Sequence, residues 1–481
     1  MQLFVKKTIQ QLIDSADSGE YQLKRSLGAL NLISLGIGAI IGAGIFTLTG
    51  IAAAHNAGPA VVLSFVVAAI GCAFAGMCYS ELASMIPVAG SAYTYAYATM
   101  GEFIAWIIGW DLVLEYAVAS AVVAAGWSGY AVSFLKDFGI HIPVQLTACP
   151  FDTVTLANGM QAHGIINVPA VGVIVFISLL LMIGIKESAV VNDVIVVIKL
   201  LVVFSFIAVG IHYIKPSNYV PYIPPNTGNF GEFGISGIMR AAGIIFFAYI
   251  GFDTVSTAAQ EAHNPQRDIP RGIIGSLFIC TIIFIVFATV LTGMLNYKAM
   301  NGDPAPVATA INMTPYPWLK FMVKFGIIAG LTSVILVMLL GQSRIFYAMS
   351  RDGLLPKLFS DIHPQWRTPW RSNLLFMVFT GFFAGFFPIS QLGNMTSIGT
   401  LLAFIIVCGG VMILRYTRPE IPRPFRVPSF PLFPILGILV CLSMMTSLDP
   451  ETWWRLIIWL IIGLIIYFTY SRFNSKLYQK E

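Results

Sequence analysis

Long apolar segments follow one another from residue 28 to residue 471, and polar connections separate them. Each is long enough for an α-helix to cross the hydrocarbon core of a bilayer, which takes about 17–25 residues. A transmembrane β-barrel would instead alternate apolar and polar positions over segments of about ten residues. The pattern therefore predicts an all-α polytopic membrane protein. We place twelve transmembrane helices at residues 28–54, 60–84, 102–132, 167–185, 189–213, 235–257, 272–295, 317–343, 372–388, 395–415, 430–447 and 453–471.

Composition and charge support this prediction and orient the chain. The sequence is 57% hydrophobic and 10% charged, whereas soluble domains have about 25% charged residues. Residues 1–27 lack the apolar core of a signal peptide, which predicts a cytoplasmic leader. With the N-terminus inside, 19 of the 27 basic residues fall on inner segments. The positive-inside rule therefore predicts a multi-pass protein of the cell inner (plasma) membrane with both termini in the cytoplasm.

Glycines interrupt two of the predicted helices at corresponding places. The first helix contains GIGAIIGAGIF (36–46), and the sixth contains FFAYIGFDTVST (246–257). Each glycine inside a helix costs about 1 kcal/mol relative to alanine. Paired interruptions indicate an inverted-repeat transporter whose site lies at the breaks, which we assign to Gly42, Gly44 and Gly251. The alternative is that the glycines only allow close helix packing, since Gly38 and Gly42 have GxxxG spacing.

The repeat hypothesis divides the chain into four parts. These are the leader 1–27, the first five helices 28–213, the inverted second five 214–415, and the last two helices with a cytoplasmic tail 416–481. Unwound backbone inside a membrane is tolerated where it is buried in protein or lines a cavity. The helix start after a break offers N–H groups to a carboxylate, and carbonyls before a break suit an ammonium group. Two facing breaks could therefore hold the zwitterion of an α-amino acid.

Four ionisable residues within the predicted helices need an interpretation. Lys199 lies near the middle of the fifth helix, and an ionisable residue at that depth indicates a functional site. We favour proton coupling, with a permanently charged helix bridge as the alternative. Glu115, one turn after Asp111, either shuttles protons or pairs with Lys199, or hydrogen-bonds while protonated. Asp253 is expected to cap the helix after the second break, and Arg240 to face an outer vestibule or the lipid headgroups.

Other functional classes find no support in the sequence. It has no P-loop, no GxSxG or HExxH context and no Rossmann pattern, so we expect neither an enzyme nor an ATP-driven pump. The six cysteines show no CxxC spacing, so no metal site is expected. We expect no cofactor besides the proton as coupling ion. The expected partners are an L-amino acid and the lipid bilayer, without nucleic acid, and the oligomeric state stays open.

Four stretches resemble the amino acid–polyamine–organocation (APC) superfamily, most closely bacterial members of its cationic amino acid transporter branch. They are GIGAIIGAGIF, GSAYTYAYATMGEFIAWIIGWDLVLEY, FFAYIGFDTVSTAAQEAHNPQRDIPRGI and GQSRIFYAMSRDGLLP. The resemblance covers essentially the whole chain and implies the LeuT-like 5+5 inverted repeat with alternating access. It also implies a substrate site whose residues are Ile40, Ala43, Gly44, Phe247, Ala248, Ile250 and Met338.

The resemblance implies a role for each part of that site. The substrate carboxylate would meet Ala43 and Gly44, and the amine would meet carbonyls near Ile40 and in 247–250. Phe247 would close over the substrate, Met338 would border its side chain, and Lys199 would stand where sodium-coupled relatives bind an ion. Many relatives have a small hydroxyl residue at position 43, and Ala43 removes that contact.

The sequence therefore favours a secondary active transporter that carries out proton-coupled symport of L-amino acids, small neutral ones first. The alternatives are an amino acid exchanger, a cationic amino acid transporter, or a membrane amino acid sensor that does not translocate its ligand.

Overall fold

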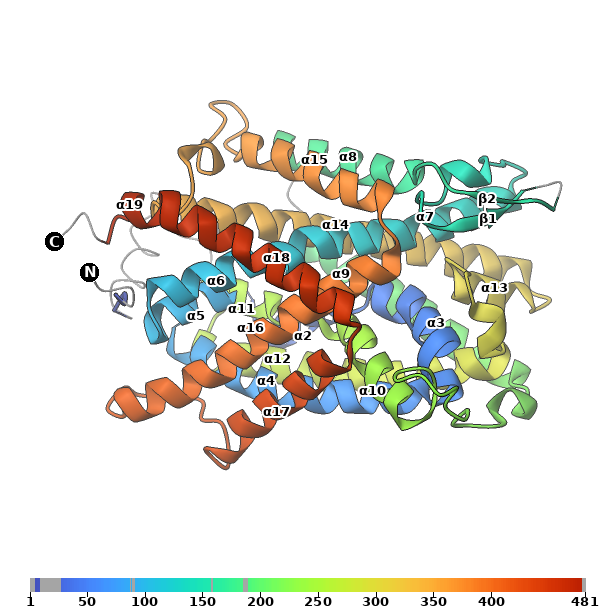
Figure 1. Ribbon diagram of the computed structural model, residues 1–481, viewed down its shortest axis with the longest axis horizontal. Coiled ribbons are helices and arrows are strands. Elements are labelled where there is room, and N and C mark those ends of the chain that lie inside the picture. The colour runs from blue at the N-terminus through green and yellow to red at the C-terminus, as the bar shows by residue number, and fades with distance from the viewer. Residues whose placement is uncertain are drawn as a thin grey trace.

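The computed structural model describes residues 5–8, 27–86, 88, 91–156, 159–184 and 189–477, so most of the leader (9–26) lies outside it. Within these ranges, eight helical stretches are long and apolar enough to cross a membrane, and three shorter apolar helices accompany them. The long helices run side by side along the longest axis of the molecule (Figure 1). The prediction of an all-α polytopic membrane protein is confirmed.

Each of the twelve predicted helices corresponds to one helix or to consecutive helical segments. The bounds are α2 (Ala29–Ile40), α3 (Thr49–Ala52), α4 (Val61–Met85), α5 (Ser91–Thr99), α6 (Glu102–Val113), α7 (Ala119–Asp137), α8 (Val168–Ile183), α9 (Ala189–Gly210), α10 (Gly234–Ile245), α11 (Thr254–Thr257), α12 (Pro265–Met294), α13 (Pro306–Asn312), α14 (Pro317–Arg351), α15 (Trp370–Phe386), α16 (Ile389–Thr417), α17 (Leu432–Ser447), α18 (Pro450–Ile466) and α19 (Arg472–Asn474). The division into two repeats at residues 213 and 214 stays a prediction.

The start of α12 differs clearly from the prediction. This helix begins at Pro265, seven residues before the expected 272, because the polar PQRD segment is itself helical. Proline is favoured in the first turn of a helix, and an acidic side chain there complements the positive end. The carboxylate of Asp268 accepts a hydrogen bond from the Asn264 amide at 3.2 Å. The helix therefore extends beyond the apolar segment on which the prediction was based.

The third predicted span lies at the centre of the bundle and the last one lies at its rim. The most apolar part of Glu102–Asp137 is 89% buried within the protein, whereas that of Pro450–Asn474 is 22% buried. Around this centre, α12 packs on α4 and α2, while α14 packs on α7 and α9. Of the two broken helices, α2 packs on α12 and α10 packs on α4.

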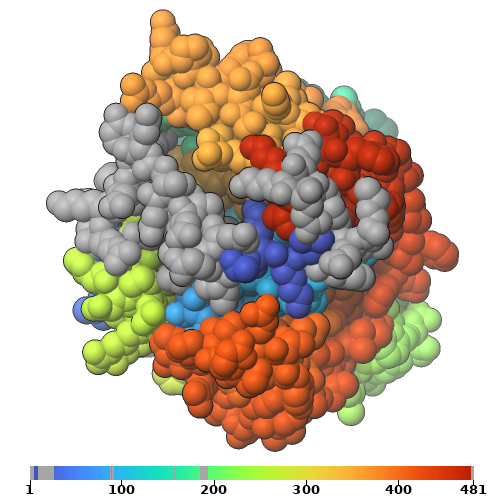
Figure 2. Space-filling model, turned by 90° about the vertical axis from the view of Figure 1, so that its left-hand side faces the viewer, coloured from blue at the N-terminus to red at the C-terminus, as the bar shows by residue number. Residues whose placement is uncertain are grey.

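Both ends of the described chain lie at the same end of the bundle. The carbonyl of Val5 accepts a hydrogen bond from the Glu102 amide at 3.0 Å. The hydroxyl of Ser475 also donates to the carboxylate of Glu102. Figure 2 looks onto this end, where the blue segment 5–8 lies near the orange-red connection between α16 and α17. The hairpin of β1 (Thr153–Thr155) and β2 (Gln161–His163) lies at the opposite end (Figure 1).

Candidate functional site

The first break separates α2 from the helical segment that follows it. Regular helix ends at Ile40, and helical backbone resumes at Ala43 and continues as the π-helical turn Gly44–Leu48. No side chain caps this new start. The first amides of a helix have no acceptor within the helix, so those beginning at Ala43 offer bare N–H groups. Ile40, Ala43 and Gly44 are all buried.

The second break follows α10. After Ile245 the chain forms a 3₁₀ turn, Phe246–Tyr249, and Ile250 is extended. Gly251 has φ +117°, a conformation that residues with a side chain rarely adopt. Helix resumes only at Thr254, in the single turn α11. Phe247, Ala248 and Ile250, which the resemblance assigns to the site, therefore all lie on non-α-helical backbone.

The two breaks cross in direct backbone contact. A Cβ atom on Gly44 would lie 2.3 Å from the Cα atom of Ala248. A Cβ atom on Gly251 would lie 2.9 Å from the carbonyl carbon of Ala39. Carbon atoms that are not bonded do not approach this closely, so both positions need glycine in this arrangement. The start of one half-helix and the irregular turn of the other thus face each other at one buried point.

Lys199 connects the first break to α14. Its ammonium group donates a hydrogen bond to the carbonyl of Gly38 at 2.6 Å, in the last turn of α2. A Cβ atom on Gly330 of α14 would lie 3.0 Å from the Lys199 side chain. The carbonyl end of a helix carries a partial negative charge. The buried cation is therefore placed where it stabilises the end of α2 directly beside the break.

One face of α14 lines the same region. A Cβ atom on Gly42 would lie 3.6 Å from Val334, and Met338 is buried one turn further along the helix. Positions 330, 334 and 338 share a helix face because they are spaced by four residues. The structure thus gathers the two breaks, Lys199 and Met338 around one buried region, and Phe247 at 6% exposed is the least buried of the predicted contacts.

Glu115 lies in a separate buried polar cluster. It is part of the π-helical turn Leu114–Val118, and its charged neighbours are Asp253 and Asp111. Neither of its carboxylate oxygens has a hydrogen-bond partner among the described residues. Glu115 therefore makes no hydrogen-bonded pair with Lys199 in this conformation, and its possible proton-shuttling role stays a prediction.

The expected capping role of Asp253 is wrong. Its carboxylate accepts hydrogen bonds from the hydroxyls of Tyr116 at 2.8 Å and Ser91 at 3.1 Å. No side chain caps the start of α11, where the Ser256 amide instead donates to the main-chain carbonyl of Asp253 at 2.8 Å. The buried hydroxyls of Ser91 in α5 and Tyr116 in the third span satisfy the carboxylate instead.

Sequence reasoning missed three polar members of this interior: Tyr116, Ser91 and Gln342. Gln342 of α14 is fully buried, and its amide has no hydrogen-bond partner among the described residues. An amide within an apolar span is a usable signal, because polar groups are expensive at that depth. Ser91 carried no such signal, since its partner Asp253 is far away in sequence.

Arg240 contacts neighbouring protein groups, and its expected position at an outer vestibule or at the headgroups stays a prediction. Its guanidinium pairs with Asp449 at 3.0 Å and donates to the carbonyl of Ser447 at 3.0 Å. Arg240 therefore ties α10 to the connection between α17 and α18.

Facing breaks in two membrane-spanning helices, with irregular backbone buried between them, are typical of secondary transporters. Comparison with known proteins agrees. The family model for amino acid permeases matches residues 27–467. The chain is 46% identical over 477 residues to the branched-chain amino acid permease BcaP of Bacillus subtilis (strain 168), with 99% of each chain covered.

Two further relatives show the breadth of the similarity. The chain is 43% identical to the methylthioribose transporter of the same bacterium, again with 99% of each chain covered. It is 35% identical to human cationic amino acid transporter 4, and this match covers 84% of the chain and 62% of the human protein. The chain belongs to the amino acid permease family of the APC superfamily, as its motifs predicted. It is a multi-pass membrane transporter of amino acids and not an enzyme.

Proposed function

We propose that the protein is a proton-coupled symporter of neutral L-amino acids with small or branched aliphatic side chains, and that it works by alternating access. The observation that carries this proposal is the contact between two bare helix breaks beside a buried lysine. Backbone amides at Ala43 and Gly44 suit a carboxylate, and they need no charged side chain to do so. The carbonyls of Ile40, Phe247, Ala248 and Ile250 suit the ammonium group.

The side-chain end of the site favours an uncharged substrate. Val334 and Met338 supply apolar surface, and the nearby cation Lys199 disfavours a second positive charge. The Bacillus subtilis relative named as a branched-chain amino acid permease supports the same class. The methylthioribose transporter is almost equally similar, so family membership alone does not identify the substrate.

Lys199 supplies a physical route to proton coupling. When protonated, it holds the end of α2 through the Gly38 carbonyl while packing on α14. Loss of the proton removes the charge that stabilises this helix end. Because α2 leads directly into the carboxylate site, substrate affinity and protonation of Lys199 would be linked, each changing the other by the same factor.

The proposed orientation places both termini in the cytoplasm and the protein in the inner membrane. The excess of basic residues on the segments at that end supports it. The shared packing of Val5 and Ser475 on Glu102 is consistent with both termini on one side.

The direct test is uptake of radiolabelled leucine and alanine into proteoliposomes with an imposed pH gradient. We expect accumulation when the outside is acidic, and we expect Lys199→Met to abolish both this accumulation and the dependence of substrate affinity on pH. Lys324→Met is the matched control, because Lys324 is equally buried but pairs with Asp137 at 2.6 Å, away from the breaks. It should keep the response to the gradient. Uptake that ignores the gradient but requires internal amino acid would instead identify an exchanger.

A further inference from the structure

A groove of about 650 Å³ lies between the first turns of α12 and the connection from α16 to α17. It has a basic part and an apolar part. Arg267, Arg271 and Gln266 line the first, and Pro270, Ile274, Gly275, Pro424 and Phe425 line the second. Figure 2 shows the yellow-green start of α12 near the orange-red α16–α17 connection on this end of the molecule. None of these residues belongs to the site at the helix breaks.

The two arginines are available to an external anion. Arg267 and Arg271 are four residues apart on α12, so their side chains leave the same helix face. Both are exposed, and neither side chain makes an ion pair or hydrogen bond with another residue in the part of the chain that the structure describes. The nearby Asp268 is buried and faces the Asn264 amide instead. The groove therefore presents two positive charges that pair with no carboxylate among the described residues.

The apolar part continues along the same helix into the membrane. Ile274, Phe278 and Ile282 are exposed and follow Arg271 at helical spacing. From Arg271 to Ile282 the helix rises about 16 Å, which is about half of the 30 Å hydrocarbon core. Charge at the groove and an apolar strip one leaflet long match the two parts of a phospholipid.

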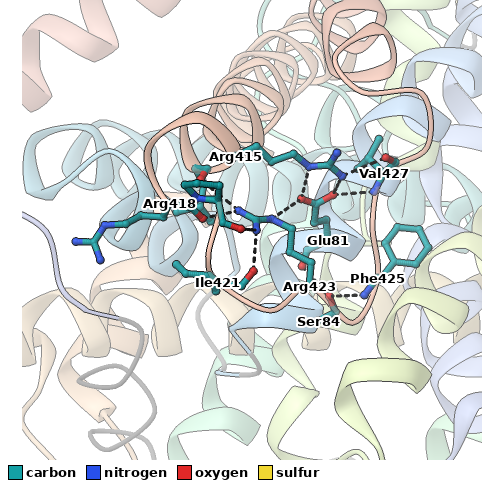
Figure 3. Close-up of polar contacts among 10 residues, drawn as sticks. Glu81, Ser84, Arg415, Arg418, Ile421, Arg423, Phe425 and Val427 are labelled. Atoms are coloured by element: carbon teal, nitrogen blue, oxygen red, sulfur yellow. Dashed lines mark hydrogen bonds and ion pairs between the residues drawn. The ribbon is translucent and has the colours of Figure 1, made fainter.

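The opposite wall of the groove is held rigidly (Figure 3). The buried carboxylate of Glu81 pairs with Arg415 and accepts the Val427 amide at 2.7 Å. Arg423 lies 3.4 Å from the same carboxylate, and the Phe425 amide donates to the hydroxyl of Ser84 at 3.3 Å. These contacts fix residues 423–427 against the end of α4. Phe425 and Pro424 thus form a preorganised wall rather than a loose loop.

We propose that this groove is a binding site for an anionic phospholipid, with the headgroup phosphates on Arg267 and Arg271 and one acyl chain along Ile274, Phe278 and Ile282. In the proposed orientation the lipid belongs to the cytoplasmic leaflet. Basic pockets between membrane helices on this side suit anionic headgroups. The bound lipid bridges α12 to the α16–α17 connection and stabilises that arrangement.

The test is native mass spectrometry of the detergent-purified protein with added phosphatidylglycerol or phosphatidylcholine of identical acyl chains. We expect tighter binding of phosphatidylglycerol, and a loss of about fivefold per arginine removed, or about 30-fold for R267Q/R271Q. The matched control is R351Q/R418Q, which removes two exposed arginines at the same end that do not line the groove. It should bind phosphatidylglycerol as the wild type does.

Several outcomes would overturn the proposal. They are equal binding of the two lipids, an equal loss in both double variants, or inorganic phosphate at millimolar concentration displacing phosphatidylglycerol. The last result would identify a site for free anions. If R267Q/R271Q does not fold, a photoreactive phosphatidylglycerol on the wild-type protein decides the question. Crosslinks within 264–282 or 424–425 support the site, and crosslinks elsewhere contradict it. Transport enters none of these measurements, so they are independent of the proposed function.

Discussion

At the scale of single residues, Gly44 and Gly42 have different roles although they are two positions apart. A methyl group on Gly44 would overlap the Ala248 backbone, whereas on Gly42 it would make an ordinary contact with Val334 at 3.6 Å. We therefore predict that Gly44→Ala lowers amino acid affinity at least tenfold by separating the two breaks. Gly42→Ala should change it less than threefold. Ligand-induced thermal shifts of the purified variants measure both, and equal affinities would return the glycines to a packing role.

Cys149 gives a prediction outside the membrane. This buried thiol donates to the carboxylate of Asp152 at 3.2 Å. Burial and the neighbouring Asp152 raise the pKa of Cys149 to about 12. Since the thiolate is the reactive form, alkylation at pH 8 should be about a thousandfold slower than for an ordinary exposed cysteine.

Mass spectrometry after iodoacetamide treatment of the native protein measures this reactivity. Protein unfolded in detergent should be labelled at Cys149 readily, which controls for detection. Rapid labelling of the native protein at pH 8 would contradict the prediction.

Residue-level reasoning could single out a residue where that residue carried an energetic anomaly. Lys199 was recognisable because a cation in mid-membrane needs an explanation, and Gly44 because glycine is unfavourable in a helix. The sequence did not identify the individual atoms that they contact, which are the Gly38 carbonyl for Lys199 and the Ala248 backbone for Gly44. Asp253 shows the limit: its position after a break suggested a cap, but the choice between a cap and the hydroxyls of Tyr116 and Ser91 is made by tertiary packing.

At the scale of elements, the end of α16 and the loop after it depend on one carboxylate of α4. Glu81 is 1% exposed and faces both Arg415 and Arg423. Removing one partner of a buried ionic group leaves uncompensated charge, which costs about 3–5 kcal/mol. We therefore predict that Glu81→Ala lowers the thermal unfolding midpoint substantially.

Glu420→Ala is the control for this change. The Glu420 side chain is 63% exposed and lies 4.0 Å from Arg418, and exposed pairs of this kind contribute less than about 1 kcal/mol. Its unfolding midpoint should therefore stay close to that of the wild type. Equal midpoints for the two variants would mean that Glu81 does not organise the loop.

Hydropathy located the helices well and their ends less well. The apolar segments correspond to the helices because the bilayer imposes a minimum apolar length. The polar first turn of α12 and the last turns of α14 were missed, because helix outside the hydrocarbon core has no apolar signature. The ion pair between Glu81 and Arg415 could not be predicted from the sequence, because 334 positions separate the two residues. Each residue taken alone is typical of a charged residue at a helix end.

At the scale of the whole molecule, α14 connects the buried site to the end where both termini pack. The same helix faces Lys199 at Gly330, borders the first break at Val334, and ends beside Asp352. Asp352 pairs with Lys7 at 2.6 Å and accepts the Tyr93 hydroxyl at 2.7 Å. The segment 5–8, α5 and α14 are thus held together by one carboxylate. In the proposed alternating-access cycle, opening of this end would break those contacts.

Asp352→Asn should therefore shift the protein towards a state open at this end. The substitution keeps the shape of the side chain and removes its charge, which weakens two charge-assisted hydrogen bonds. Since Lys7 and Asp352 are 17% and 22% exposed, we expect a loss of about 1–2 kcal/mol, or a five- to thirtyfold shift in the equilibrium. The measurement is the maleimide labelling rate of a cysteine introduced as Ala92→Cys, a buried position on α5. The native cysteines add little background, because all six are buried.

Asp361→Asn is the matched control at the same end. It removes the charge of a carboxylate that pairs with Arg371 at 2.6 Å, and both side chains of this pair are about half exposed. Labelling should accelerate in Asp352→Asn alone, and equal rates in the two variants would show that Asp352 does not hold this end closed.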